Sequence, residues 1–572
     1  MNTSFAKSAY RNFVIWGILS SLVIAVCTIV DATLIGNLVG SDGLAATSFS
    51  TPVFLVYALF GVMLGVGASV RIARALGETD TAEANRLFRC VLTTGLVISV
   101  LCWLALLFRP AFIRFLGVTE ELYPLTSRYL TVVLFCAPLF VMYHILSAAV
   151  RADSDPRLAA VAAGVVIAVN LALDLLFMLV FRWGIIGASS ALCIAEGLGV
   201  LTLLIHFRKK RALLKLRLGL PKWTDVASFL KNGFGIGSAY IFQSVVMLVF
   251  NRLLIRYSGL DAAMNVAIFG VIYSTSMVPF AVYEGASNAL ATITAFFLGE
   301  SDSDSILTVL KFALRTAICF GVAISLFCLL FAPRIALFFG LPDIVANSTA
   351  MTAIRIFSAS ILFTGINTVA TAFWQAIGRA GLAGCMSVLR NCLLLLVFGY
   401  GLIARGTIIG VSIDYVCTEL ICSLLALGVL LLRSSRRYLA RTVRTPERVF
   451  ETQYVIRADS MEQISGDLER IGEEWEIPMK TTLTINFICE ELLLNIIKFG
   501  LEDARKEHYV AIRLMAQEGN YILRIRDNVR TYNPFETEGD AIDNGVLTLI
   551  QKKAKHYVYQ RKMIFNYLYM VI

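Results

Sequence analysis

Residues 44–70 read LAATSFSTPVFLVYALFGVMLGVGASV, without an acidic or basic side chain anywhere in the stretch. A helix needs about 20 mostly apolar residues to cross the hydrocarbon core of a bilayer. This stretch is long enough to do so, and its composition is typical of a segment that faces lipid. It therefore predicts a membrane-spanning helix, and the same pattern recurs through about the first 435 residues.

By this length rule the chain has about 12 transmembrane segments, which predicts an all-α polytopic membrane protein. The first segment follows two basic residues, but it is too long for a signal peptide and no small-residue cleavage site follows promptly. It therefore predicts a retained helix, which extends toward residue 38. The predicted spans are residues 13–30, 44–70, 90–108, 129–150, 158–181, 183–205, 232–251, 262–298, 316–332, 356–377, 380–403 and 407–432.

The composition of the 572-residue chain excludes most classes of soluble protein. Hydrophobic residues make up 58% of it and charged residues 16%, whereas soluble proteins carry about 25% charged residues. This excludes an ordinary soluble enzyme, a disordered chain and a nucleic-acid-binding arm. The 12 cysteines include no Cys-x-x-Cys pair and the 4 histidines are scattered, so neither a zinc ribbon nor a redox motif is indicated.

Basic loops explain the net charge of +10, because cytoplasmic loops of membrane proteins are enriched in Lys and Arg. Basic residues concentrate at 208–222, between the sixth and seventh predicted spans, and at 433–444, after the last span. We therefore expect a multi-pass protein of the bacterial cell (inner or plasma) membrane with both termini in the cytoplasm. Its expected partner is the lipid bilayer, and no nucleic acid is expected.

The membrane part contains an internal repeat. Residues 76–80 (LGETD) recur as residues 298–302 (LGESD), 222 positions later, and residues 185–187 (IIG) recur at residues 408–410, an offset of 223. We expect an N-terminal six-helix lobe at residues 1–215 and a C-terminal six-helix lobe at residues 216–440. Parallel repeats of this kind are related by an axis along the membrane normal, which favours a transporter with a shared central cavity.

Several short motifs follow one another along the two predicted lobes. They are Val30-Asp31 with Ile35-Gly36, residues 71–77 (RIARALG), residues 151–157 (RADSDPR), Asn170 with Asp174, and residues 375–378 (QAIG). Together, over about residues 10–435, they resemble the multidrug and toxic compound extrusion (MATE) family. The resemblance implies an antiporter coupled to H⁺ or Na⁺ that exports amphipathic, often cationic, drugs or metabolites by alternating access.

Acidic residues inside the predicted spans are candidates for coupling, because a charge in a membrane helix is costly and usually functional. Asp174 follows Asn170 by four residues, which places an amide and a carboxylate on one helix face. The resemblance implies that Asp31, Asn170 and Asp174 form the cation site; a helix cap at Asp31 and an ion pair at Asp174 are the alternatives. Leu192 stands where a threonine of the family is expected, so H⁺ and Na⁺ both stay open. Gln243 stands in the seventh span, where the C-terminal lobe has no acidic residue, so coupling through that lobe alone is not expected.

Other polar and aromatic residues of the spans are candidates for a substrate cavity. Acidic side chains attract cations, and tyrosine rings stack on flat cations. Internal ion pairs and plain packing are the alternatives, and for His144 we expect packing. The candidates are Tyr57, Tyr143, Gln243, Tyr273, Glu284 and Arg390, with Glu196, Asp414 and Glu419 as further charged positions.

The composition changes after a basic linker at residues 441–449, and residues 450–572 have the pattern of a cytoplasmic α+β domain. Residues 461–475 and 483–499 have the spacing of helices. Residues 454–456, 509–515, 521–527 and 561–572 are typical of strands. We expect the helices to cover one face of a mainly antiparallel sheet.

One helix of this domain carries residues suited to a nucleotide site. Glu491 and Asn495 share a helix face, and Lys498 follows them. The side-chain oxygens of Glu491 and Asn495 are ligands that can hold Mg²⁺ against ATP phosphates. Residues 490–498 resemble the N box of the GHKL ATPases, particularly the anti-sigma-factor serine kinases, and Asp527 resembles their adenine-reading aspartate. The resemblance implies ATP, and Mg²⁺ at Asn495, as the only cofactors besides the coupling ion.

The domain also departs from the GHKL pattern. Val529 replaces a family glycine, and the second glycine box is reduced to Gly545. Glycines let the backbone approach phosphates closely, so ATP binding is expected to be weakened. Two readings stay open: a weak ATP-binding or serine/threonine kinase domain, and a sandwich that docks a cytoplasmic regulatory protein.

Three functions compete at this point. The leading hypothesis is a cation-coupled exporter of small molecules with a fused regulatory ATPase-like domain. The second is a membrane sensor that signals through the kinase-like domain. The third is a flippase for a lipid-linked precursor, which several cationic residues near the cavity centre would favour, and Arg390 is the main one.

Overall fold

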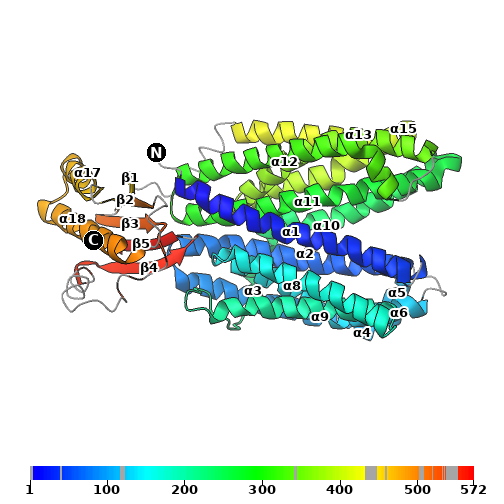
Figure 1. Ribbon diagram of the computed structural model, residues 1–572, viewed down its shortest axis with the longest axis horizontal. Coiled ribbons are helices and arrows are strands. Elements are labelled where there is room, and N and C mark those ends of the chain that lie inside the picture. The colour runs from blue at the N-terminus through cyan, green and yellow to red at the C-terminus, as the bar shows by residue number, and fades with distance from the viewer. Residues whose placement is uncertain are drawn as a thin grey trace. The chain divides into compact units, whose positions relative to one another are not determined.

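The computed structural model describes residues 4–38, 41–115, 123–339, 344–431, 447–457, 460–501, 508–517, 519–530, 533, 535, 550, 552–563 and 565–572. Contacts divide the chain into two compact units. One unit comprises residues 10–442, and the other comprises residues 443–572 with residues 1–9. The larger unit is helical, and Figure 1 shows its long helices running alongside one another as a bundle.

The first half of the bundle follows the predicted spans with two changes. Residues 104–115 form short helices rather than the end of a span. The fourth span is bent by 47° between α6 and α7, where Pro138 lies in the first turn of α7 and cannot continue a preceding helix. The elements are α1 (Ser4–Leu38), α2 (Ser41–Gly77), α3 (Thr81–Cys102), α4 (Leu104–Leu107), α5 (Arg109–Phe115), α6 (Tyr123–Phe135), α7 (Ala137–Ala152), α8 (Pro156–Asp174), the π-helix η1 (Leu175–Val180), α9 (Ile185–Leu204) and the 3₁₀ turn η2 (Ile205–Arg208).

In the second half the helices at residues 223–257 and 303–338 extend beyond the predicted spans at both ends, whereas the helix at residues 262–299 follows its span closely. Helical structure covers the last two predicted spans without a gap from residue 380 to residue 431, but Thr407 is not helical and separates them. The elements are α10 (Trp223–Tyr257), the 3₁₀ turn η3 (Gly259–Asp261), α11 (Ala262–Gly299), α12 (Ser303–Phe338), α13 (Ile344–Ala376), α14 (Ala380–Val388), the π-helix η4 (Leu389–Leu393) and α15 (Leu394–Leu431).

Nine helices of the described part are long and apolar enough to cross a membrane, or ten if the bent pair is one span. Among these nine, residues 380–430 are a single long helix, although the backbone at Thr407 is not helical. The chain is therefore an all-α polytopic membrane protein in this unit. The number twelve stays a prediction.

The two halves repeat the same local geometry at the predicted offset. Asp80 caps α3 by accepting a hydrogen bond from the Glu83 amide at 2.8 Å, and Asp302 caps α12 in the same way at 3.0 Å. An acidic N-cap satisfies a backbone N–H that has no partner inside the helix. Further along, Gly184 (φ 56°, ψ −133°) and Thr407 (φ 48°, ψ −122°) adopt the same unusual conformation 223 residues apart. The repeat is thus a structural one.

The halves meet through α2, which packs along α10 and α11. At the ends of α2 and α11 the equivalent glycines Gly77 and Gly299 lie against each other's helix. A Cβ atom at Gly77 would lie 2.1 Å from the Phe296 carbonyl oxygen, and one at Gly299 would lie 2.1 Å from the Arg74 carbonyl oxygen. Only glycine allows backbones to approach this closely.

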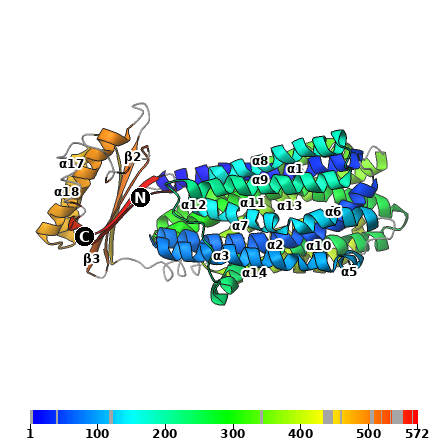
Figure 2. The ribbon, with the colours of Figure 1, turned by 90° about the horizontal axis from the view of Figure 1, so that it is seen from below.

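The smaller unit contains a five-stranded antiparallel sheet with the order β1-β2-β3-β5-β4. Figure 2 shows α17 and α18 on one face of this sheet. Alternate strand residues such as Ile512, Leu523 and Leu568 pack with Ile464 and Leu492 of the helices to form its core. The elements are β1 (Arg448–Val455), α17 (Ser460–Glu474), α18 (Met479–Asn495), the π-helix η5 (Ile496–Gly500), β2 (Tyr509–Gln517), β3 (Asn520–Asp527), β4 (His556–Lys562) and β5 (Phe565–Val571).

Two boundaries in this unit differ from the sequence prediction. The predicted terminal strand at residues 561–572 is divided between β4 and β5, which form a hairpin around Met563 at φ 49°. Strand β1 begins at Arg448, inside the predicted linker. Both differences arise because the strand ends are set by pairing with neighbouring strands, which composition does not reveal.

Candidate functional site

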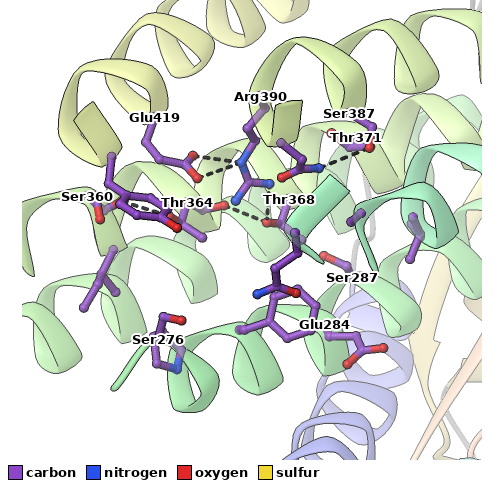
Figure 3. A pocket seen from close by; sticks show the side chains of 18 of the residues that line it. Ser276, Glu284, Ser287, Ser360, Thr364, Thr368, Thr371, Ser387, Arg390 and Glu419 are labelled. Atoms are coloured by element: carbon purple, nitrogen blue, oxygen red, sulfur yellow. Dashed lines mark hydrogen bonds and ion pairs between the residues drawn. The ribbon is translucent and has the colours of Figure 1, made fainter. Parts of the chain in front are cut away.

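A polar cavity lies among α10, α11, α13, η4 and α15 of the second half (Figure 3). Seven serine and threonine side chains and three side-chain amides line it. Its charged residues are Glu284, Arg390 and Glu419, and its apolar wall includes Phe280 and Phe357. A cavity of this composition can hold a small molecule that has an apolar body and several polar groups.

An ion pair occupies one side of the cavity. Arg390 Nε lies 2.8 Å from Glu419 Oε1 and 2.9 Å from Oε2. Asn367 Nδ2 donates to Glu419 Oε2 at 2.6 Å, and Arg390 Nη1 donates to Thr368 Oγ1 at 3.1 Å. Buried charges persist when they are paired and hydrogen-bonded in this way. Arg390 belongs to the π-helix η4, a distortion that often marks functional sites.

Glu284 supplies a second negative charge from α11. Its Oε1 accepts a hydrogen bond from the Tyr240 hydroxyl at 3.2 Å. Arg151, at the end of α7, lies within electrostatic range of this carboxylate, but no basic group of the described residues forms an ion pair with it. Figure 3 shows Glu284 apart from the Arg390–Glu419 pair.

The predicted amide–carboxylate pair is present in the first half. Asn170 Nδ2 donates to Asp174 Oδ2 at 2.7 Å, and both residues are buried. Asp174 is the last residue of α8, directly before the π-helix η1. Asp31 belongs to α1, but its side chain lies outside the described residues, so the predicted three-residue cation site is described only at Asn170 and Asp174.

The predicted cavity residues are divided between two places. Gln243, Glu284 and Arg390 line the cavity. Tyr57 and Tyr143 lie in the packed core of the first half, where Tyr57 stacks on Phe140 with ring centroids 5.6 Å apart.

The other positions named from the sequence have local roles or lie elsewhere. Tyr273 is half-buried on α11, outside the described lining. His144 packs against Gly61, as expected for a packed residue. Asp414 accepts a hydrogen bond from Thr418 at 3.2 Å, and Glu196 lies on α9. Sequence reasoning missed Asn367 and Thr368, whose signal was two adjacent polar residues within an apolar run.

In the smaller unit Asn495 and Glu491 lie one turn apart on α18, and Asn495 Nδ2 donates to the Glu491 carbonyl oxygen at 2.8 Å. Lys498 is exposed on η5, whereas Gly545 lies outside the described residues. Asp527 ends β3, and its Oδ1 accepts from Asn566 Nδ2 at 2.8 Å and from the Val529 amide at 3.2 Å. Burial raises the pKa of Asp527 to about 7.

The family model described as MatE matches residues 16–176 and 236–401, which make up more than half of the chain. The chain belongs to the MatE family. The resemblance carried by the short motifs is thereby confirmed. The matched ranges include Asn170, Asp174, Glu284 and Arg390, so the buried pair and most of the cavity's charges belong to the part that MatE proteins share.

Two multidrug export proteins align with this chain over most of their own length. Multidrug export protein MepA of Staphylococcus aureus (strain NCTC 8325 / PS 47) is 24% identical over 433 residues, covering 75% of this chain and 94% of that protein. The protein of the same name from Staphylococcus saprophyticus is 24% identical over 424 residues, covering 73% and 92%. These matches leave about a quarter of the MatE chain described here without a counterpart.

Solved structures share the fold of the membrane unit. One, described as the outward-facing conformation of a multidrug resistance MATE family transporter of the MOP superfamily, has a TM-score of 0.71 at 22% identity, covering 77% of this chain and 97% of that one. A MOP superfamily transporter from Pyrococcus furiosus, described as having a binding pocket of reverse polarity, has a TM-score of 0.68 at 22% identity with the same coverage. The MATE transporter fold is therefore shown.

Proposed function

We propose that this MatE protein is a cation-coupled multidrug exporter that moves amphipathic, mainly cationic, small molecules by alternating access. The buried Asn170–Asp174 pair carries the proposal, because a carboxylate inside a membrane helix is costly and is therefore usually functional. The names of the MepA relatives, which denote multidrug export, support the substrate class. The repeat supports the mechanism, since two equivalent halves can rock against each other around a shared cavity.

In this mechanism Asp174 binds and releases the coupling ion. A buried carboxylate can take up a proton, and with the amide oxygen of Asn170 it can also offer hard oxygen ligands to Na⁺. The cavity in the second half would hold the substrate, with Glu284 attracting its positive charge. Binding of the ion would then favour one arrangement of the two halves and release of the substrate the other.

The experiment that tests the function is efflux of a fluorescent cationic dye from proteoliposomes that contain the full chain. A Na⁺ gradient and a pH gradient are imposed separately. We expect one gradient to drive efflux and the other to have little effect, which also identifies the coupling ion. Dye retention under both gradients, in vesicles shown to contain folded protein, would reject the proposal.

The two alternatives have less support. A flippase for a lipid-linked precursor needs several cationic side chains to hold phosphates, but Arg390 is the one basic residue among the described residues that line the cavity. A sensor would need the C-terminal unit for its action, whereas an exporter needs it only for regulation. Efflux that continues after removal of residues 446–572 would favour the exporter over the sensor.

The orientation follows from the basic loops and is tested by labelling. Lys210 is exposed after η2, in the predicted cytoplasmic loop, and Arg114 is exposed on α5, in the predicted outer loop. In a background from which reactive native cysteines have been removed, Lys210→Cys should react with an impermeant maleimide only from the cytoplasmic side. Arg114→Cys, the matched control, should react only from outside. The reverse pattern would place both termini outside the cell.

We further propose that the C-terminal unit is a GHKL-like module with weak nucleotide affinity. The main support is the placement of Asn495 beside Glu491 and of the buried Asp527 at the end of a central strand. Among the described residues the oxygen of the Asn495 amide accepts no hydrogen bond, which leaves it for Mg²⁺. The alternative is a module that docks a regulatory protein and binds no nucleotide.

Calorimetry on the full chain in detergent should show Mg²⁺-dependent ATP binding with a Kd of about 1 mM. Asn495→Ala should remove the Mg²⁺ dependence, since an amide oxygen is lost. Asp527→Ala should remove the preference for ATP over GTP.

Because the pKa of Asp527 is about 7, its carboxylate ionises as the pH rises through 7, and the preference for ATP over GTP should increase from pH 6 to pH 8. Submicromolar binding would show that the missing glycines do not matter, and no heat at millimolar ATP would leave only the docking module.

A further inference from the structure

The Arg390 side chain has donors that point into the cavity after its ion pair is formed. A guanidinium carries five N–H groups. Here Nε donates to the Glu419 carboxylate and Nη1 donates to Thr368 Oγ1. No oxygen of the described residues accepts from Nη2. The side chain is 12% exposed, and it lines the cavity. Figure 3 shows its guanidinium near the middle of the lining residues.

The negative charge of the cavity, on Glu284, also has hydrogen-bonding capacity that the described residues do not fill. Glu284 receives one hydrogen bond, from Tyr240 to Oε1, and none of the described residues donates to Oε2. The residue is partly exposed toward the same cavity. The cavity therefore presents a cation with open donors and an anion with an open acceptor at separate positions, with hydroxyl groups such as Thr364 and Ser287 nearby (Figure 3).

We propose that this cavity selects zwitterionic amphipathic molecules that carry a carboxylate as well as a cationic nitrogen group; this rests on the proposed export function. The carboxylate binds Arg390 through its open Nη groups, and the cationic group binds Glu284. The apolar body lies against Phe280 and Phe357. Arg390 thus acts as a specificity-determining residue.

The charges favour a zwitterion over a singly charged molecule for a physical reason. A simple cation would satisfy Glu284 but would leave the Arg390 donors without a partner from the ligand, at a side chain that is only 12% exposed. A simple anion would bind Arg390 but would leave the Glu284 carboxylate without a positively charged partner. Leaving a buried charged donor or acceptor without a partner costs affinity, whereas hydrogen bonds between a guanidinium and a carboxylate are among the stronger ones in proteins.

A matched pair of dyes tests the proposal. One is a rhodamine methyl ester, which is a cation, and the other is the same rhodamine with a free carboxylate, which is a zwitterion. Binding of each dye to the detergent-purified full chain is measured by fluorescence polarisation, and efflux of each is measured in proteoliposomes. We expect the wild type to bind the zwitterion at least about tenfold more tightly, as one charge-assisted hydrogen bond allows.

The variants remove the selecting charge without leaving its partner alone. Arg390→Gln alone would leave the Glu419 carboxylate without its cation. The decisive protein is therefore the double variant Arg390→Gln with Glu419→Gln, which removes both charges. It should lose the tenfold preference by weakening binding of the zwitterion while binding the ester about as before. Glu284→Gln should weaken binding of both dyes. The control Arg355→Gln, on an exposed position of α13, should keep the preference.

Each outcome decides one question. Equal binding of both dyes by the wild type, or an equal loss of both in the double variant with unchanged thermal stability, would overturn the proposal. Export of the ester without any preference for the zwitterion would reject the zwitterion but keep the exporter. A wild type that binds the zwitterion tightly and exports neither dye would support the site and reject the exporter.

Discussion

Replacing Asp174 with asparagine should reduce gradient-driven dye efflux to the rate of protein-free liposomes. Asparagine has nearly the shape of aspartate and still accepts the hydrogen bond that Asn170 donates at 2.7 Å, so the fold should persist. It cannot ionise, however, and therefore cannot exchange a proton or balance the charge of Na⁺. The measurement is efflux under the gradient that drives the wild type, with downhill dye exchange recorded in parallel.

The matched control is Asp304→Asn, which removes an exposed carboxylate in the first turn of α12. It should leave efflux near the wild-type rate. If Asp174→Asn also transports at the wild-type rate, coupling through the first half is contradicted. The carboxylates of the second half, Glu284 and Glu419, would then be the remaining described candidates in the cavity.

Replacing Gly77 with alanine should slow transport at least about tenfold, because overpacking of a close contact typically costs 1–3 kcal/mol. The new methyl carbon would lie 2.1 Å from the Phe296 carbonyl oxygen, which is backbone and cannot rotate away. The two ends of α2 and α11 would have to separate, so the arrangement of the halves seen here should become less populated. Gly299→Ala should have the same effect through Arg74.

Gly270 on α11 is the control for this pair, since a methyl group there meets no atom within 4 Å. Gly270→Ala should transport normally, and its helix should gain a little stability because alanine favours helix over glycine. Thermal unfolding of each variant separates a blocked transition from a damaged fold. Normal transport by Gly77→Ala would show that the contact between the halves is not part of the cycle.

Local patterns were enough to predict the class of the protein and the larger part of its organisation. Charge-free stretches such as residues 44–70 predicted membrane helices because a bilayer imposes one length on every span. The spacing of Asn170 and Asp174 predicted their contact because helix geometry alone brings positions i and i+4 together. The repeat of residues 76–80 predicted equivalent turns, which the matching caps at Asp80 and Asp302 display.

Element ends were predicted less well wherever a neighbour decides them. The hairpin between β4 and β5 was missed because residues 561–572 are uniformly suited to a strand and only pairing shows where one ends. The bend between α6 and α7 depends on Pro138 within a stretch whose hydropathy is continuous. Composition averages over such single residues, so it reports that an element exists before it reports where the element stops.

The sequence by itself determined that this chain is a membrane protein with two repeated halves and an amide–carboxylate pair on one helix face, because hydropathy, repeated motifs and i, i+4 spacing are all read along the chain. Only the tertiary structure decided that Arg390 pairs with Glu419, that Tyr57 packs in a core rather than in the cavity, and that Gly77 meets the end of α11. Those contacts join residues 29 or more positions apart. They arise from the packing of whole helices, which no spacing between residues encodes.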